Sequence, residues 1–394
     1  MPDKDADGLS SGVILHRTLE LLGLPTELID VHLITKGSTV HSESERQLMG
    51  EKKPKYIFVL DQGSRQSEPL ISTTEHTALV IDHHHATPSD FPAGASFITA
   101  CNSPPVATTS LLTYTLCHPL HTNVEERCAW LCIVGTHGDL GNTIKWEDPF
   151  PDMKATFKAY TKKLLNDVVS YVNAPRRTAT YDVVSAWNAL LTATHPSDVL
   201  KHPRLLAARE EVNAEVERCT HTAPKFSLDG RVAVFRIRSA AQVHPVIATR
   251  WAGHLQSKAL EIVLVANEGY LDGKVNFSCR IARCARGRDP PVNIIESLKA
   301  YASLKPEGNG VDENAELDED RKPLIERLGQ DFARGHVQAS GGIVNVDEFE
   351  ELMRLMRVGE KAEKKDGQEA SPKKSGKAMD PKQKNTLMNY FGKK

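Results

Sequence analysis

The sequence contains no run of about 18 consecutive apolar residues, the length that a membrane-spanning helix needs. Its seven cysteines include no Cys-x-x-Cys pair, which excludes the commonest spacing of a zinc site. Cysteines scattered in this way are typical of reduced thiols inside the cell. The net charge is only −2, so the chain as a whole is not a polycation. These absences leave an intracellular globular protein as the expected class.

Charge is distributed unevenly along the 394 residues. Residues 359–394 contain ten lysines and five acidic residues, a net charge of +5, so the first 358 residues carry −7. The length suffices for two domains and a tail. We therefore expect a mildly acidic body and a basic tail that has a partner of its own.

An acid and three histidines follow a short apolar run at residues 77–81: Asp82, His83, His84 and His85. The run is typical of a buried strand, and ligands of open α/β sheets gather beyond the carboxyl ends of strands. A carboxylate and a neutral imidazole at such a place can bind a divalent metal. A polar loop rich in histidine is the alternative. Against it, acids recur at comparable places: Asp5, Asp7, Asp61 and Asp139.

Apolar spacing predicts alternating strands and helices in the first half of the chain. Strands are expected at residues 27–34, 55–60 and 77–81, and helices after Gly8 and at residues 106–117 and 125–134. Asp139 would then lie in a loop, residues 135–142. The acids at residues 3–7 precede the first helix with no strand before them, so we expect that strand upstream of Met1. The alternation favours a mostly parallel sheet covered by helices.

The pattern of the second half predicts another α/β domain. Its expected strands and helices are residues 232–237, 260–266 and 274–280, and residues 246–257, 293–300 and 346–356. Residues 335–342 are expected to form a tight glycine-rich loop. The predicted fold class is therefore α/β, with two α/β domains, a metal-binding cleft between them and a disordered C-terminal tail.

Five clusters occur in an order that resembles the motifs of a known family. Four are similar to the motifs of the DHH phosphoesterase family: Asp5-x-Asp7-Gly8, Asp61, Asp82-His83-His84 and Gly138-Asp139. The fifth resembles the glycine-rich motif of the DHH-associated C-terminal domain, residues 334–342. Residues 3–8, Asp-Lys-Asp-Ala-Asp-Gly, are closer to the RecJ-like nuclease branch than to the pyrophosphatase branch.

The resemblance implies a division of the chain into four parts. They are a DHH catalytic domain at residues 1–200, a connecting helix at 201–225, a DHH-associated substrate-binding domain at 226–358, and a disordered basic tail at 359–394. The composition of the tail cannot bury enough apolar surface to order itself.

The resemblance also implies two divalent ions, Mn²⁺ or Mg²⁺, that hydrolyse a phosphoester or phosphoanhydride. Two such ions lower the pKa of a water molecule and neutralise the attacked phosphoryl group. By resemblance, Asp61 bridges the ions, and His84 stabilises or protonates the leaving oxygen. The other implied ligands are Asp5 for the first ion, and Asp7, His83 and Asp139 for the second.

Five residues of the second domain are implied to bind the substrate: Arg280, Gly335, His336, Gly341 and Gly342. Glycines let backbone amides approach a phosphate closely, although a plain turn is the alternative for this segment. One position departs from the pyrophosphatase branch, which has a histidine four residues before the acid matched by Asp5. Here that position is Met1, and because a thioether is a poor ligand for Mn²⁺ or Mg²⁺, Asp3 is the candidate replacement.

The tail contains one apolar-aromatic cluster, Leu387, Tyr390 and Phe391, at i, i+3 and i+4. This spacing projects three side chains from one helical turn and resembles a peptide that binds the PCNA sliding clamp. The glutamine expected at the first position is one residue out of register, at Gln383. The alternative is a short stub that binds nothing. The clamp interpretation favours the nucleus over the cytoplasm.

Three functions are consistent with these patterns. The first is a metal-dependent phosphodiesterase, an exonuclease on single-stranded DNA or RNA that uses two-metal hydrolysis. The second is a hydrolase of oligonucleotides or small phosphate compounds, which the acidic body and the absence of an evident basic aromatic groove favour. The third is an inactive DHH adaptor at replication sites, which the Met1 departure favours and the full set of ligand-type residues opposes.

Overall fold

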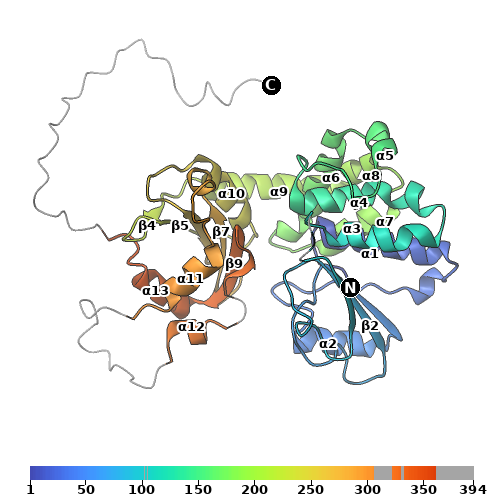
Figure 1. The fold of residues 1–394 in the computed structure, drawn as a ribbon, viewed down its shortest axis with the longest axis horizontal. Coiled ribbons are helices and arrows are strands. Elements are labelled where there is room, and N and C mark those ends of the chain that lie inside the picture. The colour runs from blue at the N-terminus through green and yellow to red at the C-terminus, as the bar shows by residue number, and fades with distance from the viewer. Residues whose placement is uncertain (102, 104, 306–321, 330–331, 361–394) are drawn as a thin grey trace, which may run out of the picture. The chain divides into compact units, whose positions relative to one another are not determined.

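The computed structural model describes residues 1–101, 103, 105–305, 322–329 and 332–360. The predicted clamp-binding residues of the tail lie outside the described residues: Leu387, Tyr390 and Phe391. A long helix, α9 (Pro203–Cys219), separates the N-terminal lobe, residues 1–201, from the C-terminal lobe, residues 225–360 (Figure 1). None of the helices in the described ranges is both long and apolar enough to cross a membrane.

A small parallel sheet organises the N-terminal lobe. Its strands are β1 (Tyr56–Leu60), β2 (Thr77–Asp82) and β3 (Ser96–Thr99), in the order β1-β2-β3. Residues 1–3 lie beside β1: Pro2 forms a parallel bridge with Leu60, and the Asp3 amide donates to the Leu60 carbonyl oxygen at 2.9 Å. Residues 1–3 therefore lie beside the end of β1, and the strand that we expected upstream of Met1 stays a prediction.

Helices supply most of the apolar core of the N-terminal lobe, centred on Trp130, Leu131 and Leu9. Five of them are α1 (Ala6–Leu21), α3 (Thr109–Cys117), α4 (Val124–Leu140), α6 (Lys162–Asn173) and α7 (Val183–Thr192). The others are η1 (Thr26–Leu28), α2 (Glu43–Glu51), η2 (His118–Leu120), α5 (Lys154–Ala159), η3 (Pro175–Arg177) and α8 (Pro196–Lys201). A second, smaller core joins β1 and β2 to α2.

The C-terminal lobe is built on a six-stranded mixed sheet in the order β4-β5-β6-β7-β9-β8. Its strands are β4 (Lys225–Phe226), β5 (Val232–Ile237), β6 (Ile262–Asn267), β7 (Lys274–Ile281), β8 (Arg334–His336) and β9 (Ala339–Asn345). Only β5 and β6 pair in parallel. The helices are α10 (His244–His254), η4 (Arg283–Ala285), α11 (Ile294–Ala302), α12 (Leu324–Arg327) and α13 (Val346–Leu355).

Alternation along β5 shows that helices cover both faces of this sheet. Val232 and Val234 face the core shared with α11, α12 and α13, whereas Ala233 and Phe235 face the core shared with α9 and α10. Successive side chains of a strand point to opposite faces, so a strand covered on both sides is apolar throughout. The predicted α/β fold class with two α/β parts is confirmed.

Three local predictions were wrong. Residues 27–34 form no strand, because the amide of Thr35 and the ring of His32 bind the buried carboxylate of Glu45 instead of a neighbouring strand. Asp139 is not in a loop, because α4 continues to Leu140. The segment expected to be a tight loop at residues 335–342 is a β-hairpin, with a turn at 337–338 between β8 and β9.

Candidate metal centre

Two strand ends place two of the acids next to each other. Asp61 follows β1 and Asp82 ends β2, and the parallel register pairs Leu60 with Ile81. The Asp61 amide donates to the Ile81 carbonyl oxygen at 2.9 Å, and its φ of 64° lies in the left-handed region. A residue other than glycine adopts that conformation at a cost, and such strain concentrates at functional sites.

The beginning of α1 supplies three more acids. Asp5 caps the helix by accepting the amides of Asp7 and Gly8 at 3.1 and 3.2 Å, so α1 starts at Ala6 and Asp7 lies in its first turn. A Cβ on Gly8 would lie 2.6 Å from the Asp3 carbonyl oxygen. Glycine is therefore required there for Asp3 to fold back toward the helix.

Asp7 is fully buried, and backbone amides at the start of α3 bind both of its carboxylate oxygens. Thr109 donates to Oδ2 at 2.8 Å, and Ser110 donates to Oδ1 at 2.9 Å. The Thr109 hydroxyl also donates to Oδ1 of Asp61 at 3.1 Å. A helix N-terminus favours negative charge, so α3 partly offsets the repulsion among the acids. Sequence reasoning missed this pair; the signal was the Thr-Thr-Ser run before an apolar helix.

Gly135 of α4 allows that helix to approach the same point. A Cβ at this position would lie 2.2 Å from Oγ of Ser110 and 2.8 Å from Oδ1 of Asp7. The close approach brings the last turn of α4, which carries Asp139, toward the other acids. This residue was also missed, although a glycine inside an apolar helix is a signal of close packing.

His83 is buried among three carboxylates. Its Nε2 lies 3.0 Å from Asp139 Oδ2, 3.3 Å from Asp61 Oδ1 and 3.8 Å from Asp7 Oδ2. Neither ring nitrogen forms a well-directed hydrogen bond with any described residue, and the side chain is only 2% exposed. Buried polar atoms normally have partners. A cation between the imidazole and the carboxylates would provide one.

The ligand-type atoms fall into two sets that share Asp61. One set is Asp3, Asp5 and Asp61, and the other is Asp7, Asp61, His83 and Asp139, with all ligand atoms of a set within 4.8 Å of one another. A third set joins Asp61, His83 and His84. Carboxylate oxygens with an imidazole suit Mn²⁺ or Mg²⁺, so the residues present fit two divalent ions. The structure brings together all five residues predicted as metal ligands, together with Asp3, the candidate replacement for the position of Met1.

The pKa shifts of the acids reflect burial and crowding. Burial, and next the charge of Asp139, raises the pKa of Asp7 to about 6. Burial together with the charges of Asp7 and Asp5 raises the pKa of Asp61 well above its ordinary value. Carboxylates that repel each other in this way gain stability from a bound cation.

Asp82 orients His84 rather than joining the ligand sets. Its Oδ1 accepts hydrogen bonds from Nδ1 of His84 at 2.7 Å and from the His83 amide at 2.8 Å. Burial opposes both shifts, but the hydrogen bond between the two side chains raises the pKa of His84 to about 9 and lowers that of Asp82 to about 2. His84 is therefore protonated at neutral pH. His336 of the C-terminal lobe stacks on it, with ring centroids 6.0 Å apart.

The other predicted substrate residues lie on β7, β8 and β9. Arg280 is half-buried, and its NH1 donates to the Ser278 hydroxyl at 2.9 Å. Gly335 has a φ of 102°, and Gly341 pairs with β7 on one side and β8 on the other. A Cβ on Gly341 would lie 2.5 Å from the Phe277 carbonyl oxygen. Strand packing thus accounts for Gly341 without a ligand, while Gly342 pairs with Phe277 only.

Two arginines of η3 near the acids were missed by sequence reasoning. Arg176 lies 3.8 Å from Asp5, and its charge helps to lower the pKa of that acid against the effect of burial. Arg177 is half-buried, forms no hydrogen bond or ion pair through its side chain with another described residue, and has a pKa lowered to about 9 by burial and by Arg176. The only sequence signal was the dipeptide itself, which is more often a solvated surface pair.

Comparison with known proteins finds one family model and several solved structures to which this chain is similar. Residues 1–136 match the model of the DHH family, N-terminal domain. The structure is similar to RecJ from Thermus thermophilus in complex with Mn²⁺, with a TM-score of 0.57 and 19% identity over 90% of this chain and 51% of that chain. It is also similar to exonuclease RecJ bound to manganese, with a TM-score of 0.52 and 18% identity over 90% and 87% of the two chains. No curated protein sequence matches this chain.

The likeness to RecJ holds for the fold, because the identities are only 19% and 18%. The chain spans about half the length of RecJ from Thermus thermophilus. The match over residues 1–136 includes the acids of α1, Asp61 and the Asp-His-His segment, three of the clusters on which the resemblance rested. Residues 1–136 thus match the N-terminal domain of the DHH family, and the structure has a RecJ-like fold.

Proposed function

We propose that this chain is a divalent-metal-dependent phosphoesterase that removes nucleotides from an end of single-stranded DNA or RNA. The observation that carries the proposal is the pair of ligand sets that share Asp61. Two adjacent cation sites joined by one carboxylate are the arrangement that in-line displacement at a phosphoryl group uses. The RecJ-like fold supports nucleic acid as the substrate.

Separate groups of residues in this chain would bind the two cations. Asp3 and Asp5 would hold one cation, Asp7, His83 and Asp139 would hold the other, and Asp61 belongs to both ligand sets. When bound, the two cations lower the pKa of a water molecule and neutralise charge on the attacked phosphate. The complete ligand sets support an active enzyme over an inactive adaptor.

His84 is the proposed general acid. Its Nδ1 is occupied by Asp82, so Nε2 is the nitrogen left to give a proton to the leaving oxygen. The raised pKa keeps that proton in place at neutral pH. The Asp82 carboxylate holds the ring in one orientation, as a positioned acid needs.

Cationic groups beside the acids are proposed to bind phosphate oxygens of the strand. The side chain of Arg177 has no partner among the described residues. Its planar guanidinium group is therefore available to form paired hydrogen bonds with a phosphate. Arg280 and His336 of the C-terminal lobe are proposed to contact the same substrate, as the family resemblance implies. Roles for Gly335 and Gly342 as amide donors also remain proposals, as does the clamp-binding role of the tail.

The test is nucleotide release from end-labelled single-stranded DNA and RNA with Mn²⁺, beside a dinucleotide and pyrophosphate. Processive shortening of the strands is expected, and Asp61→Asn should abolish it while the far-UV circular dichroism is unchanged. Cleavage of the dinucleotide alone would identify an oligonucleotide hydrolase. Binding of two Mn²⁺ ions with no hydrolysis of any of the four compounds would contradict an enzymatic role.

A further inference from the structure

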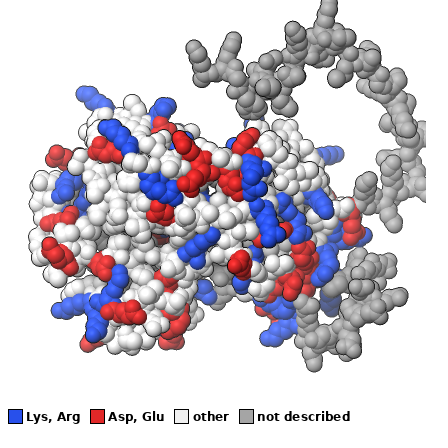
Figure 2. Space-filling view, turned by 180° about the vertical axis from the view of Figure 1, so that it is seen from behind, with Lys and Arg blue, Asp and Glu red and all other residues white. Residues whose placement is uncertain are grey.

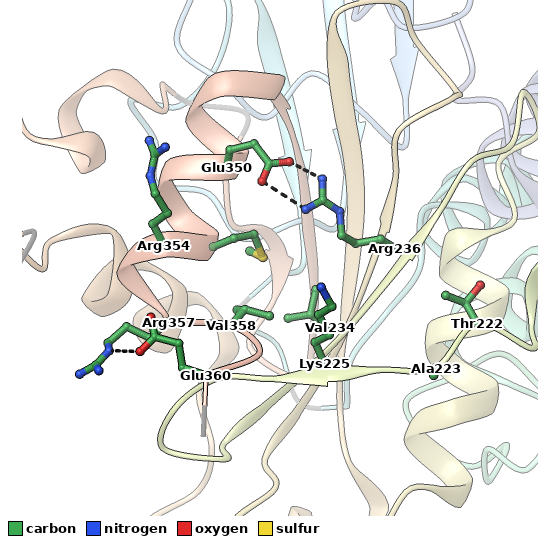
Figure 3. A pocket seen from close by; sticks show the side chains of 11 residues that line it. Thr222, Ala223, Lys225, Val234, Arg236, Glu350, Arg354, Arg357, Val358 and Glu360 are labelled. Atoms are coloured by element: carbon green, nitrogen blue, oxygen red, sulfur yellow. Dashed lines mark hydrogen bonds and ion pairs between the residues drawn. The ribbon is translucent and has the colours of Figure 1, made fainter. Parts of the chain in front are cut away.

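A second concave site lies in the C-terminal lobe, between β4 and β5 and the helix α13 (Figure 3). Its cavity measures about 320 Å³. It is lined by Thr222, Ala223, Lys225, Val234, Arg236, Glu350, Met353, Arg354, Arg357, Val358 and Glu360. None of these residues belongs to the ligand sets of the metal centre or to the substrate residues proposed above.

The cavity combines an apolar floor with a charged rim. Val234 and Met353 form the floor and are 2% and 6% exposed. The segment after α13 closes one side, because the Gly359 amide donates to the Phe226 carbonyl oxygen of β4 at 2.8 Å. The floor therefore offers a small apolar surface, including a polarizable sulfur atom, inside a polar surround.

The rim carries more positive than negative charge. Of its four basic residues, Arg236 is paired with Glu350 and Glu268, and Arg357 is paired with Glu360. Lys225 and Arg354 are exposed and form no hydrogen bond or ion pair through their side chains with another described residue. With two acids in the lining, the cavity has a net charge of +2. Figure 2 shows basic and acidic residues interspersed over the face that it draws.

The cavity is well separated from His336, the residue of the C-terminal lobe that stacks on His84. Within the sheet, β5 and the His336-bearing β8 have β6, β7 and β9 between them. At about 4.8 Å per strand, that separation is roughly 19 Å. The chain continues from Glu360, which lines the cavity, into residues 361–394, which contain ten lysines and four acidic residues.

We propose that this cavity is an exosite that binds one nucleotide of a longer strand, away from the end being cleaved. The inference rests on the proposed function. A nucleotide offers both surfaces that the cavity matches: a phosphate for Lys225 and Arg354, and a base face for the apolar floor with Met353. A peptide made of acidic residues alone would satisfy the rim but has no apolar face for the floor.

The test compares long and short ligands in a double variant, Lys225→Met with Arg354→Met, which removes two charges and keeps the alkyl length. A matched control is Lys55→Met with Arg127→Met, one lysine and one arginine that are also exposed and form no side-chain pair with another described residue. Binding of a long single strand is measured in an Asp61→Asn background across a salt series. Dinucleotide hydrolysis is measured in the active background.

The expected result is weaker binding of the long strand and a smaller slope of log K against log salt. Each phosphate neutralised on a single strand contributes about 0.7 to that slope, so the loss of the one phosphate held by Lys225 and Arg354 should reduce it by about 0.7. Dinucleotide hydrolysis should not change, because a dinucleotide held at the metal centre is too short to reach the cavity. The control pair should leave both measurements as in the parent.

Three outcomes would overturn the exosite. They are an unchanged salt slope, an equal change in the control pair, and binding of an acidic peptide at the cavity with no effect on strand binding. Failure of the proposed function is recognised separately, because it would appear as the absence of strand hydrolysis in the parent protein, whereas the exosite is tested by strand binding. If the double methionine variant fails to fold, Lys225→Gln with Arg354→Gln makes the same charge change with polar side chains.

Discussion

The side-chain oxygen of Asn173 accepts the amide hydrogen of Ala6 at 3.2 Å, which ties the end of α6 to the first turn of α1. The same oxygen accepts Nε of Arg176 at 3.1 Å, and Arg176 in turn lies 3.8 Å from Asp5. Asn173 is 6% exposed and touches no ligand set. It therefore acts on the cation site of Asp3, Asp5 and Asp61 only by positioning other groups.

Replacing Asn173 with alanine should weaken one cation site more than the other. Partners that orient ligands are typically worth about 10–100-fold in metal affinity, and the site containing Asp5 should lose that amount. The site containing Asp7 should change little. Isothermal titration with Mn²⁺ resolves the two sites, and Asn173→Asp, which keeps an acceptor, should restore part of the affinity. An equal loss at both sites, or no rescue by aspartate, would show a general packing defect instead.

Asp61→Asn should separate function from stability. Both cation sites use this carboxylate. Its loss should therefore lower Mn²⁺ affinity and hydrolysis by more than the roughly 10–100-fold that is typical when a residue that only orients a ligand is replaced. In the absence of metal the variant should melt at a higher temperature than the parent, because a buried charge beside Asp7 and Asp5 is removed. Differential scanning calorimetry with and without Mn²⁺ checks both signs. A lower melting temperature in metal-free buffer would mean that the bond from Thr109 outweighs the repulsion.

The elements and residue types that depend on local pattern could be predicted from the sequence. Apolar runs located β1 and β2, and acids at strand ends indicated Asp61 and Asp82. The α/β class and the family resemblance both followed from such patterns and are confirmed.

Features that depend on contacts between distant segments could not be predicted. Thr109 binds Asp7 across more than 100 residues of sequence, and Arg176 reaches Asp5 across still more. Asp139 was misplaced because glycines at the end of an apolar run usually end a helix, whereas here helix packing requires Gly135. The hairpin at residues 335–342 was predicted as a loop, because glycines are typical of turns. Here Gly341 is instead required by the close pairing of neighbouring strands.

The stabilising effect of metal should depend on pH. The pKa of Asp7 is raised from 3.8 to about 6 in the folded protein, so the folded state holds a proton that the unfolded state has lost between these values. Without metal, the contribution of this group to stability is favourable at low pH and is lost as pH rises through about 6. Mn²⁺ competes with that proton. The melting temperature should therefore rise more on adding Mn²⁺ at pH 7 than at pH 5, and an equal rise at both would contradict the assignment.

Gly135→Ala should damage the metal centre through packing. The added methyl group would overlap Ser110 and approach Asp7, so a shift of α4 or of the α3 terminus is required. Overpacking of this kind typically costs about 1–3 kcal/mol, and Mn²⁺ affinity at the site of Asp7 should fall. Gly138→Ala is the matched control, because the atom nearest to the added Cβ would be the Cβ of Ala6, at 3.1 Å. Urea denaturation gives the stability of each variant. A larger loss at Gly138 than at Gly135 would contradict the account.

The bond between Asp82 and His84 predicts the alkaline limit of activity. With a pKa raised to about 9, His84 keeps its proton at neutral pH, and hydrolysis should fall as that proton is lost, no later than about pH 9. His84→Gln should reduce the turnover rate by about 10²–10⁴-fold, the usual contribution of a general acid, and should remove the alkaline limb.

Asp82→Asn distinguishes the acid from a merely structural histidine. The variant keeps an oxygen that can accept from the ring but removes the negative charge that raises the pKa of His84. The alkaline limb should therefore move toward the ordinary histidine value near 6.5, while activity at about pH 5.5 stays closer to that of the parent. Rates measured from about pH 5 to 10 with saturating Mn²⁺ give the profile. A limb that does not move, in a variant that still binds metal, would show that the proton reaches the leaving oxygen from another group.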